Sequence, residues 1–207
     1  ALSYSIKLTE IRPTTEDDKK IADALNQIFQ LFPQANALGK TQKVENVRQA
    51  IEKYQQIVDL SKILQDKSLA ANALLQKYFL HLQLTEYPNA LETAEQALAI
   101  WTELGNKSGQ AVLLDKIGII YNRQNNYQKA IEYYEKALAV AREANSNAVT
   151  SILTNLATAY DNSGNPTKAV EFHQQAIAKQ RELGFRGEEG RAVVNLGLVF
   201  YRLSQYD

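Results

Sequence analysis

The most informative absence in this sequence is that of cysteine, since its 207 residues contain none. A chain without cysteine cannot form disulfides, use a thiolate as a nucleophile or hold zinc and iron through sulfur. Histidine is nearly absent too, with only His81 and His173. The sequence therefore lacks most of the side chains from which nucleophilic and metal-dependent active sites are built.

An excess of charge of either sign is also missing. Lysine and arginine together number 23, aspartate and glutamate together number 23, and the formal net charge is zero. Proteins that bind nucleic acid neutralise its phosphates with a surplus of basic residues. We therefore expect no nucleic-acid partner.

Long apolar runs are lacking as well. No segment approaches the roughly 18 consecutive apolar residues needed to cross a bilayer, so we expect no association with a membrane. The chain is nevertheless 45% hydrophobic, which is enough for a continuous core. It begins with Ala1 and Leu2 rather than methionine and has no signal-peptide core. We expect a cytoplasmic protein from which an upstream segment is missing.

What the sequence does contain is an internal repeat with a period close to 40 residues. Ala50, Ala90, Ala130 and Ala169 each open a similar apolar stretch rich in Glu, Lys and Gln. A fixed period of this length indicates one supersecondary unit that is repeated and stacked. Each copy then buries against its neighbours the apolar surface that it cannot bury alone. Such an array offers a long groove rather than a pocket.

The best-defined copies carry a recognisable motif. The first has Leu114, Ile117, Gly118, Tyr121, Ala130, Tyr134 and Ala137, and the next has Leu153, Leu156, Ala157, Tyr160, Ala169, His173 and Ala176. This pattern resembles the tetratricopeptide repeat. The resemblance implies an all-α fold, a right-handed α-solenoid of antiparallel helix pairs. Apolar residues that recur three and four positions apart independently predict helices with one apolar face.

The remaining copies are less regular. One begins with Val193, Leu196, Gly197 and Phe200 and is truncated by the end of the chain, while Lys77 and Tyr78 stand where the motif has Leu and Gly. We expect a repeat array over residues 44–207, made of the second helix of a first repeat, repeats at about 68–105, 107–145 and 147–184, and the first helix of a further repeat at 187–205. Residues 1–43 are expected to form an extended arm over 1–13 and a helical cap with an irregular join around Pro33 and Gly39.

Start and stop signals agree with the period. Asn126 and Asn165 suit the N-caps of second helices, with Pro166 at a first helical position, and Gly105, Asn145 and Gly184 suit left-handed helix ends. Gly118, Ala157 and Gly197 are expected to let the two helices of a repeat approach to about 8 to 10 Å. Repeats of about 40 rather than 34 residues resemble those of kinesin light chain, of LGN-type scaffolds, and of bacterial signalling proteins in which such arrays precede a caspase-like peptidase (CHAT) domain.

No catalytic or metal-binding constellation emerges from the sequence. His81 and His173 occupy repeat positions normally filled by an aromatic packing residue, and we expect both in the core. The glycines at 184–190 follow no strand and precede no Gly-Lys-Ser/Thr, so they fit a turn better than a phosphate loop. We predict a protein that is not an enzyme and needs no cofactor or metal.

In arrays of this kind the first helices line the concave wall, and the candidate groove residues follow from their register. They are Lys116, Asn122, Arg123, Asn155, Thr158, Asn162, Arg191, Asn195, Leu198 and Arg202. Asn155 and Asn195 lead the set because a carboxamide can both donate to and accept from a peptide bond; alternatively, they link neighbouring helices. The basic members favour a ligand with acidic side chains, although Asp115 and Asp161 lie nearby. The set does not match a clamp for a C-terminal carboxylate.

These features predict a non-catalytic scaffold that binds a peptide or protein segment in its concave groove. Asn155→Ala combined with Asn195→Ala is expected to weaken partner binding and to leave melting unchanged. One alternative is the regulatory or sensor region of a larger enzyme, for example one with a C-terminal CHAT peptidase-like domain. Another is self-association through the uncapped last helix, by way of Leu196, Val199, Phe200 and Leu203.

Overall fold

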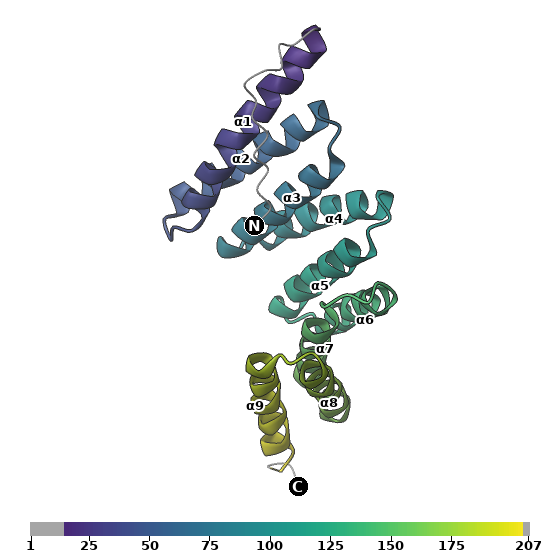
Figure 1. Cartoon of the computed structure of the whole chain (residues 1–207). Helices are drawn as coiled ribbons and strands as arrows, with labels where there is room; N and C mark the ends of the chain where they lie inside the picture. Colours follow the sequence, from purple (N-terminus) through teal and green to yellow (C-terminus); the bar gives the residue numbers. More distant parts are fainter. Residues whose placement is uncertain (1–14, 205–207) are drawn as a thin grey trace. The chain divides into compact units, whose positions relative to one another are not determined.

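The structure is a computed structural model that describes residues 15–204. Within this range the chain forms nine α-helices and no strand (Figure 1). They are α1 (Glu16–Gly39), α2 (Val44–Ile63), α3 (Lys67–Gln83), α4 (Tyr87–Glu103), α5 (Lys107–Arg123), α6 (Tyr127–Glu143), α7 (Val149–Asn162), α8 (Pro166–Glu182) and α9 (Arg186–Leu203). The all-α repeat solenoid is therefore confirmed, whereas the extended arm expected over residues 1–13 lies outside the described residues.

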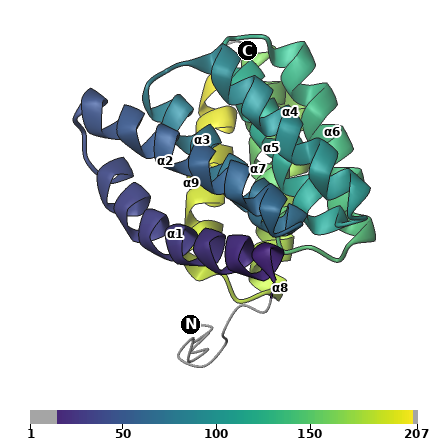
Figure 2. The same ribbon diagram turned by 90° about the horizontal axis from the view of Figure 1, so that it is seen from above.

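The chain divides into two compact units, residues 1–80 and 81–207. The first contains α1, α2 and most of α3, and the second contains α4 to α9 (Figures 1 and 2). In the first unit α1 packs against α2, and in the second unit each of the helices from α4 to α9 packs against the next along the chain.

In the first unit, α1 and α2 form a hairpin, and α1 corrects one expectation from the sequence. Pro33 lies inside α1 rather than at an irregular join. The helix is held on both sides of the proline by Tyr54 of α2, whose ring meets Phe32 edge-on at 6.0 Å and whose hydroxyl donates to Asn36 Oδ1 at 2.7 Å. These tertiary contacts offset the helix hydrogen bond that proline cannot make.

The turns between helices share one backbone conformation. Each of seven helices is followed, two residues after its last residue, by a residue with positive φ; these are Gln65, Thr85, Gly105, Asn125, Asn145, Gly164 and Gly184. At Gly105 the backbone N–H donates to the Thr102 carbonyl, and the N–H of Asn106 donates to the Trp101 carbonyl at 2.9 Å. This left-handed closure satisfies carbonyls at the helix end. The predicted ends at Gly105, Asn145 and Gly184 are confirmed.

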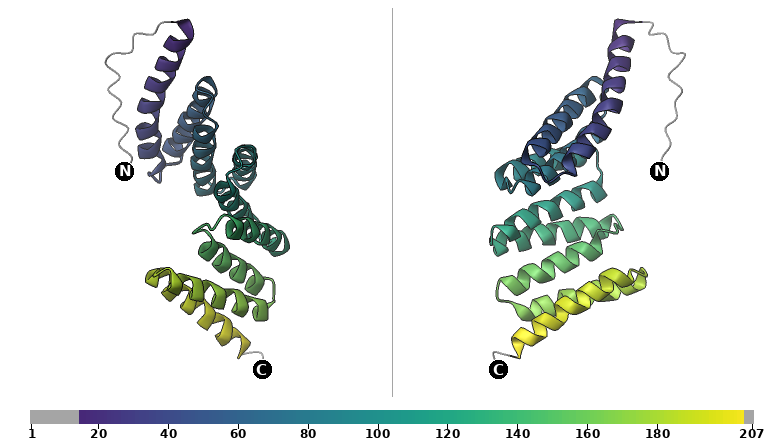
Figure 3. Two further views of the ribbon diagram at one scale, coloured as in Figure 1. Left: turned by 45° about the vertical axis from the view of Figure 1, so that its right-hand side comes forward. Right: turned by 90° about the vertical axis from the view of Figure 1, so that its left-hand side faces the viewer.

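The predicted helix starts are confirmed as well. Asn126 caps α6 by accepting from the N–H of Lys129, and Asn165 caps α8 by accepting from the N–H of Lys168. Pro166 occupies the first position of α8, where its missing N–H costs nothing. Because α4, α5, α6 and α8 each have 17 residues, successive helices of the second unit present similar lengths to one another (Figure 3).

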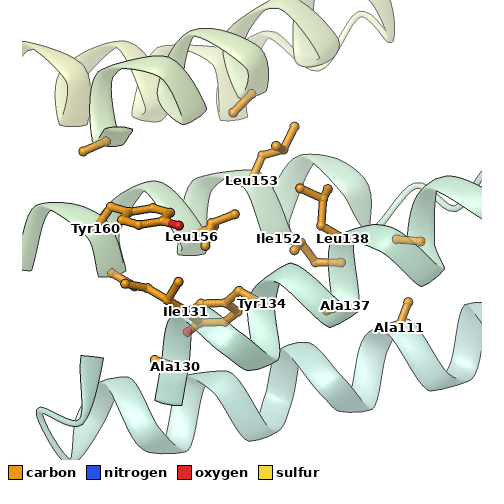
Figure 4. Packing of buried hydrophobic residues seen from close by; sticks show 14 of the residues in the cluster. Ala111, Ala130, Ile131, Tyr134, Ala137, Leu138, Ile152, Leu153, Leu156 and Tyr160 are labelled. Carbon is orange, nitrogen blue, oxygen red and sulfur yellow. The ribbon is translucent and has the colours of Figure 1, made fainter. Parts of the chain in front are cut away.

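The core of the second unit lies between successive helix pairs (Figure 4). Tyr134 of α6 and Leu156 of α7 are almost completely buried there, and the Tyr160 ring stacks on Phe172 with 5.4 Å between centroids. His173 is 1% exposed, as expected for a packing position, and burial lowers its pKa, so that the neutral form is favoured. His81 is buried with its Nδ1 atom 2.8 Å from Glu86 Oε2.

Two glycines at the same repeat position have different surroundings. A Cβ on Gly118 would lie 2.6 Å from the buried ring of Tyr134, so this glycine allows the close approach of α5 and α6. A Cβ on Gly197 would meet no atom within 4 Å. The close approach expected at Gly118 is therefore present, and no described residue packs against Gly197.

This difference gives opposite predictions for the same substitution. Gly118→Ala should lower stability, because an overpacked core costs about 1 to 3 kcal/mol and the better helix propensity of alanine returns only about 1 kcal/mol. Gly197→Ala should raise it by roughly 0.5 to 1 kcal/mol, since the alanine meets no obstacle. Thermal unfolding followed by circular dichroism checks both changes. Shifts of Tm in the same direction would contradict the packing at Gly118.

Candidate binding surface

The candidate residues lie on three helices of the second unit. Lys116, Asn122 and Arg123 belong to α5, Asn155, Thr158 and Asn162 to α7, and Arg191, Asn195, Leu198 and Arg202 to α9. Side-chain bonds link α5 to α7 and α7 to α9. We call the exposed side chains of α5, α7 and α9 the first-helix face.

Asn155 is engaged within the protein. Its Nδ2 donates to Asp115 Oδ1 at 2.8 Å, which joins α7 to α5. The Asp115 side chain is 4% exposed, and its other oxygen lies 3.0 Å from Lys116 Nζ. A buried carboxylate requires such donors. Asn155 therefore links two neighbouring helices, which is the alternative role considered for it in the sequence analysis. Its Oδ1 accepts no hydrogen bond from another described residue.

Asn195 differs from Asn155 although the two occupy equivalent positions. It is half-buried on α9 and bonds to no other side chain among the described residues. Leu198, one turn further along α9, is 54% exposed. These two side chains are therefore available to a ligand.

The basic residues of the first-helix face are mostly paired with carboxylates. Arg202 Nη2 bonds to Asp161 Oδ2, Lys116 pairs with Asp115, and Arg191 lies 3.8 Å from Glu188. Arg123 and Asn162 are exposed. The positive potential expected from Lys116, Arg123, Arg191 and Arg202 is therefore largely offset.

The last two candidates, Thr158 and Asn122, differ in how their side chains are hydrogen-bonded. Thr158 Oγ1 donates to the Thr154 carbonyl at 2.9 Å, so its hydroxyl hydrogen is already used. Asn122 is half-buried, and its Oδ1 is buried without a hydrogen-bond partner. Both side chains can still accept a hydrogen bond.

A cavity of about 330 Å³ lies where α7, the end of α8 and the start of α9 meet. Thr150, Thr154 and Asn155 of α7 line one side, Gln180 of α8 lines another, and Glu188 and Arg191 of α9 complete it. Gln180 is 4% exposed, and its Oε1 is buried without a hydrogen-bond partner. An unpaired buried carbonyl is costly, so Gln180 is a candidate for contact with water or a ligand.

A larger cavity, of about 500 Å³, lies among the end of α6, the start of α7 and α8. Its polar side chains are mostly satisfied by one another. Arg142 Nη2 donates to Gln175 Oε1 at 3.0 Å, and Lys179 Nζ lies 2.8 Å from Glu182 Oε1. This cavity presents less unsatisfied hydrogen-bonding capacity than the smaller one.

Reasoning from the sequence missed Gln180, although a signal was present. The equivalent positions in the two preceding repeats carry Trp101 and Ala141, and Ala141 is fully buried. A polar residue at a position that is apolar in its sister repeats is a candidate for function. The cluster of hydroxyls in α7, formed by Thr150, Ser151 and Thr154, was a second signal.

Over residues 15–204 no group of three or more acidic or histidine side chains is placed to hold a metal ion. In the same range no helix is both long and apolar enough to span a bilayer.

Comparison with known proteins identifies the family. Residues 69–143 and residues 149–184 each match a tetratricopeptide repeat family model, and together these ranges make up more than half of the chain. The chain belongs to the tetratricopeptide repeat family. No curated protein matches it in sequence.

Several solved structures share the fold. BtubC (BKLC) from P. vanneervenii is 19% identical with a TM-score of 0.63, and the match covers 92% of this chain and 85% of that one. The match to the STAND protein with a tetratricopeptide repeat sensor from Pyrococcus horikoshii has a TM-score of 0.72 at 17% identity and covers 89% of this chain and 32% of that one. A Rap protein complexed with competence and sporulation factor matches with a TM-score of 0.65 at 17% identity, over 96% of this chain and 52% of that one. At these identities the likeness concerns the fold alone.

The engagement of Asn155 revises the expectation that both asparagines can be removed without affecting melting. Asn155→Ala should destabilise the protein by about 1 to 3 kcal/mol, because it leaves the buried Asp115 carboxylate with one donor fewer. Asn195→Ala should stay within roughly 0.5 kcal/mol of the parent, as is usual for a side chain without partners. Urea unfolding at pH 7 measures both. Equal stability of the two variants would contradict a structural role for Asn155.

Proposed function

We propose that this protein is a non-catalytic scaffold whose first-helix face binds an extended or helical segment of another protein. Tetratricopeptide repeats are protein-interaction modules, and the chain belongs to that family. The observation that carries the finer proposal is the smaller cavity, which is formed by α7, α8 and α9 and leaves the buried Oε1 of Gln180 without a partner. Asn195 and Leu198 extend the available surface along α9.

The relatives are compatible with this role. The Rap structure is of a protein in complex with competence and sporulation factor, and in the Pyrococcus horikoshii protein the repeats are described as a sensor. We do not extend the proposal to an acidic partner. Three of the four basic residues that suggested one lie beside carboxylates of the same unit.

A second candidate is a regulatory role within a larger enzyme. The similarity to the STAND protein favours it, because this chain corresponds to 32% of that protein, whose repeats are a sensor. The two candidates are compatible, since a sensor also works by binding a ligand on its repeats. What distinguishes them is whether binding changes the activity of an attached domain.

Self-association is the third candidate from the sequence, and α9 supplies its support. Of the residues expected to be uncovered, Phe200 is about half-exposed and Leu196 and Leu203 are half-buried, but Val199 is 1% exposed because it packs into the core. Val193, Val194 and Tyr201 are about half-exposed or more and take its place. An exposed apolar surface favours contact with another protein surface, and a second copy of this chain is one such surface.

Affinity capture with matched variants tests the main proposal. Asn195→Ala with Leu198→Ala removes two exposed side chains of the first-helix face, while Glu171→Ala with Gln174→Ala does the same on the outer surface of α8. The parent and the α8 variant should retain the same partner from a cell extract. The α9 variant should bind it at least about tenfold more weakly, since central interface residues often contribute more than 1 kcal/mol each.

Circular dichroism provides the control, since both variants should keep the helix content and Tm of the parent. Equal retention of the partner by both variants, or its loss only from the α8 variant, would place the binding surface elsewhere and contradict the proposal. Sedimentation of the parent over a range of concentrations separates partner binding from self-association.

A further inference from the structure

We infer that the cavity between α7, α8 and α9 receives the cationic side chain of a lysine or arginine from the bound segment. This inference rests on the proposed function and names the chemistry of the partner. It follows from the hydrogen-bonding state of the lining groups, whose hydroxyls and carboxylate offer acceptors, while the N–H donors of the lining belong to Asn147, Gln180 and Arg191.

The hydroxyls of α7 have all used their hydrogens. Thr150 Oγ1 donates to the Asn147 carbonyl, Ser151 Oγ donates to the Ala148 carbonyl at 2.9 Å, and Thr154 Oγ1 donates to the Thr150 carbonyl at 3.0 Å. All three side chains line the cavity. A hydroxyl carries one hydrogen and two lone pairs, so what these groups can offer a ligand is acceptor capacity.

Two carboxamides add acceptors of the same kind. Gln180 Oε1 is buried and has no hydrogen-bond partner. Asn155 directs its Nδ2 to Asp115, which leaves its Oδ1 for a ligand. A buried acceptor without a donor costs free energy that a donating ligand would return.

The mouth of the cavity also suits a cation. Glu188 contributes a carboxylate, and Phe185, the residue before α9, contributes an aromatic ring that is 38% exposed. Ring faces attract ammonium and guanidinium groups. Arg191 also lines the cavity, 3.8 Å from Glu188, and its positive charge would repel a cationic ligand. Its side chain is 77% exposed, so water screens this charge.

The balance of donors and acceptors distinguishes a cation from a neutral amide. A lysine ammonium has three donors and an arginine guanidinium has five, and neither has an acceptor. A glutamine or asparagine side chain would bring its own carbonyl oxygen toward the hydroxyl lone pairs. The hydroxyls of α7 and the Glu188 carboxylate therefore suit a group that only donates, while Asn147, Gln180 and Arg191 add donors to the same lining.

The test uses small probes on the ¹⁵N-labelled chain, followed by ¹H–¹⁵N NMR. The cationic probes are the N-methylamides of Nα-acetyl-lysine and Nα-acetyl-arginine, and the neutral probes are those of Nα-acetyl-norleucine and Nα-acetyl-glutamine. We expect the cationic probes to shift the side-chain amide signals of Gln180 and Asn155 with Kd values of about 1 to 10 mM. The neutral probes should bind at least about fivefold more weakly, which corresponds to the loss of one hydrogen bond.

Variants identify the groups responsible. Gln180→Leu removes the buried acceptor and should weaken the cationic probes about fivefold or more, read from backbone amides of α7 and α9. Glu188→Gln removes an exposed carboxylate and should also weaken them, so the test does not depend on the stability of a core variant. Gln174→Leu is the matched control, because Gln174 is exposed on α8 away from the cavity lining.

Three results would overturn the inference. The first is equal binding of the glutamine and lysine probes, and the second is unchanged binding to both Gln180→Leu and Glu188→Gln. The third is that butylamine binds as tightly as the lysine probe, which would make a free amine the ligand rather than a peptide side chain. The probes need no partner protein, so this test is independent of partner capture. The cation inference can fail while the proposed scaffold function holds, and the proposed function can fail while the cation inference holds.

Discussion

The left-handed residue that ends each of the helices α4 to α8 is the constraint on which the rest of the second unit depends. A left-handed residue ends one helix after another, at Gly105, Asn125, Asn145, Gly164 and Gly184. Each closure stops the helix at a similar length and reverses the chain within a short turn. Side chains 39 or 40 residues apart therefore occupy equivalent positions, and each helix pair covers the apolar surface left by the previous one. The same register brings Asn155 of α7 within hydrogen-bonding distance of Asp115 of α5.

Local sequence signals predicted the regular part of the fold because the tetratricopeptide motif depends on interactions between residues that are close in the sequence. Asn126 and Asn165 cap helices because an N-cap depends on residues three positions apart. Pro33 was misjudged for the opposite reason. Its place inside α1 depends on contacts with Tyr54, 21 residues away in the sequence, and helix propensity carries no information about such a partner. The division of the chain into a cap and a repeat array stays a prediction.

The candidate site could be predicted only in outline. The repeat register placed Asn155 and Asn195 on first helices, but it could not distinguish them, because the difference lies in the neighbouring helix. Asn155 meets Asp115, whereas Asn195 meets no such group among the described residues. Gly118 likewise lies under the Tyr134 ring of α6, a contact that the repeat register alone does not give. Residues at equivalent repeat positions occupy the same place on their helices, but their contacts depend on the side chains of the neighbouring repeat.

The polar cavity beside α7 illustrates what such local differences can achieve. Trp101 and Ala141 fill the positions equivalent to Gln180 in the preceding repeats, and Ala141 is buried in the apolar core. Placing a glutamine there lowers stability unless water or a ligand satisfies it. The serine and threonine hydroxyls of α7, the Glu188 carboxylate and the Phe185 ring surround the same space. A repeat array can thus acquire specificity by changing a few side chains while its helices stay unchanged.

The most direct measurement is a crystal structure of this chain with the segment of its captured partner. Our account predicts that the segment lies along α7 and α9, contacts Asn195 and Leu198, and places a lysine or arginine side chain in the cavity beside Gln180. A segment bound to the outer surfaces of α6 and α8, with the cavity beside Gln180 left empty, would contradict it.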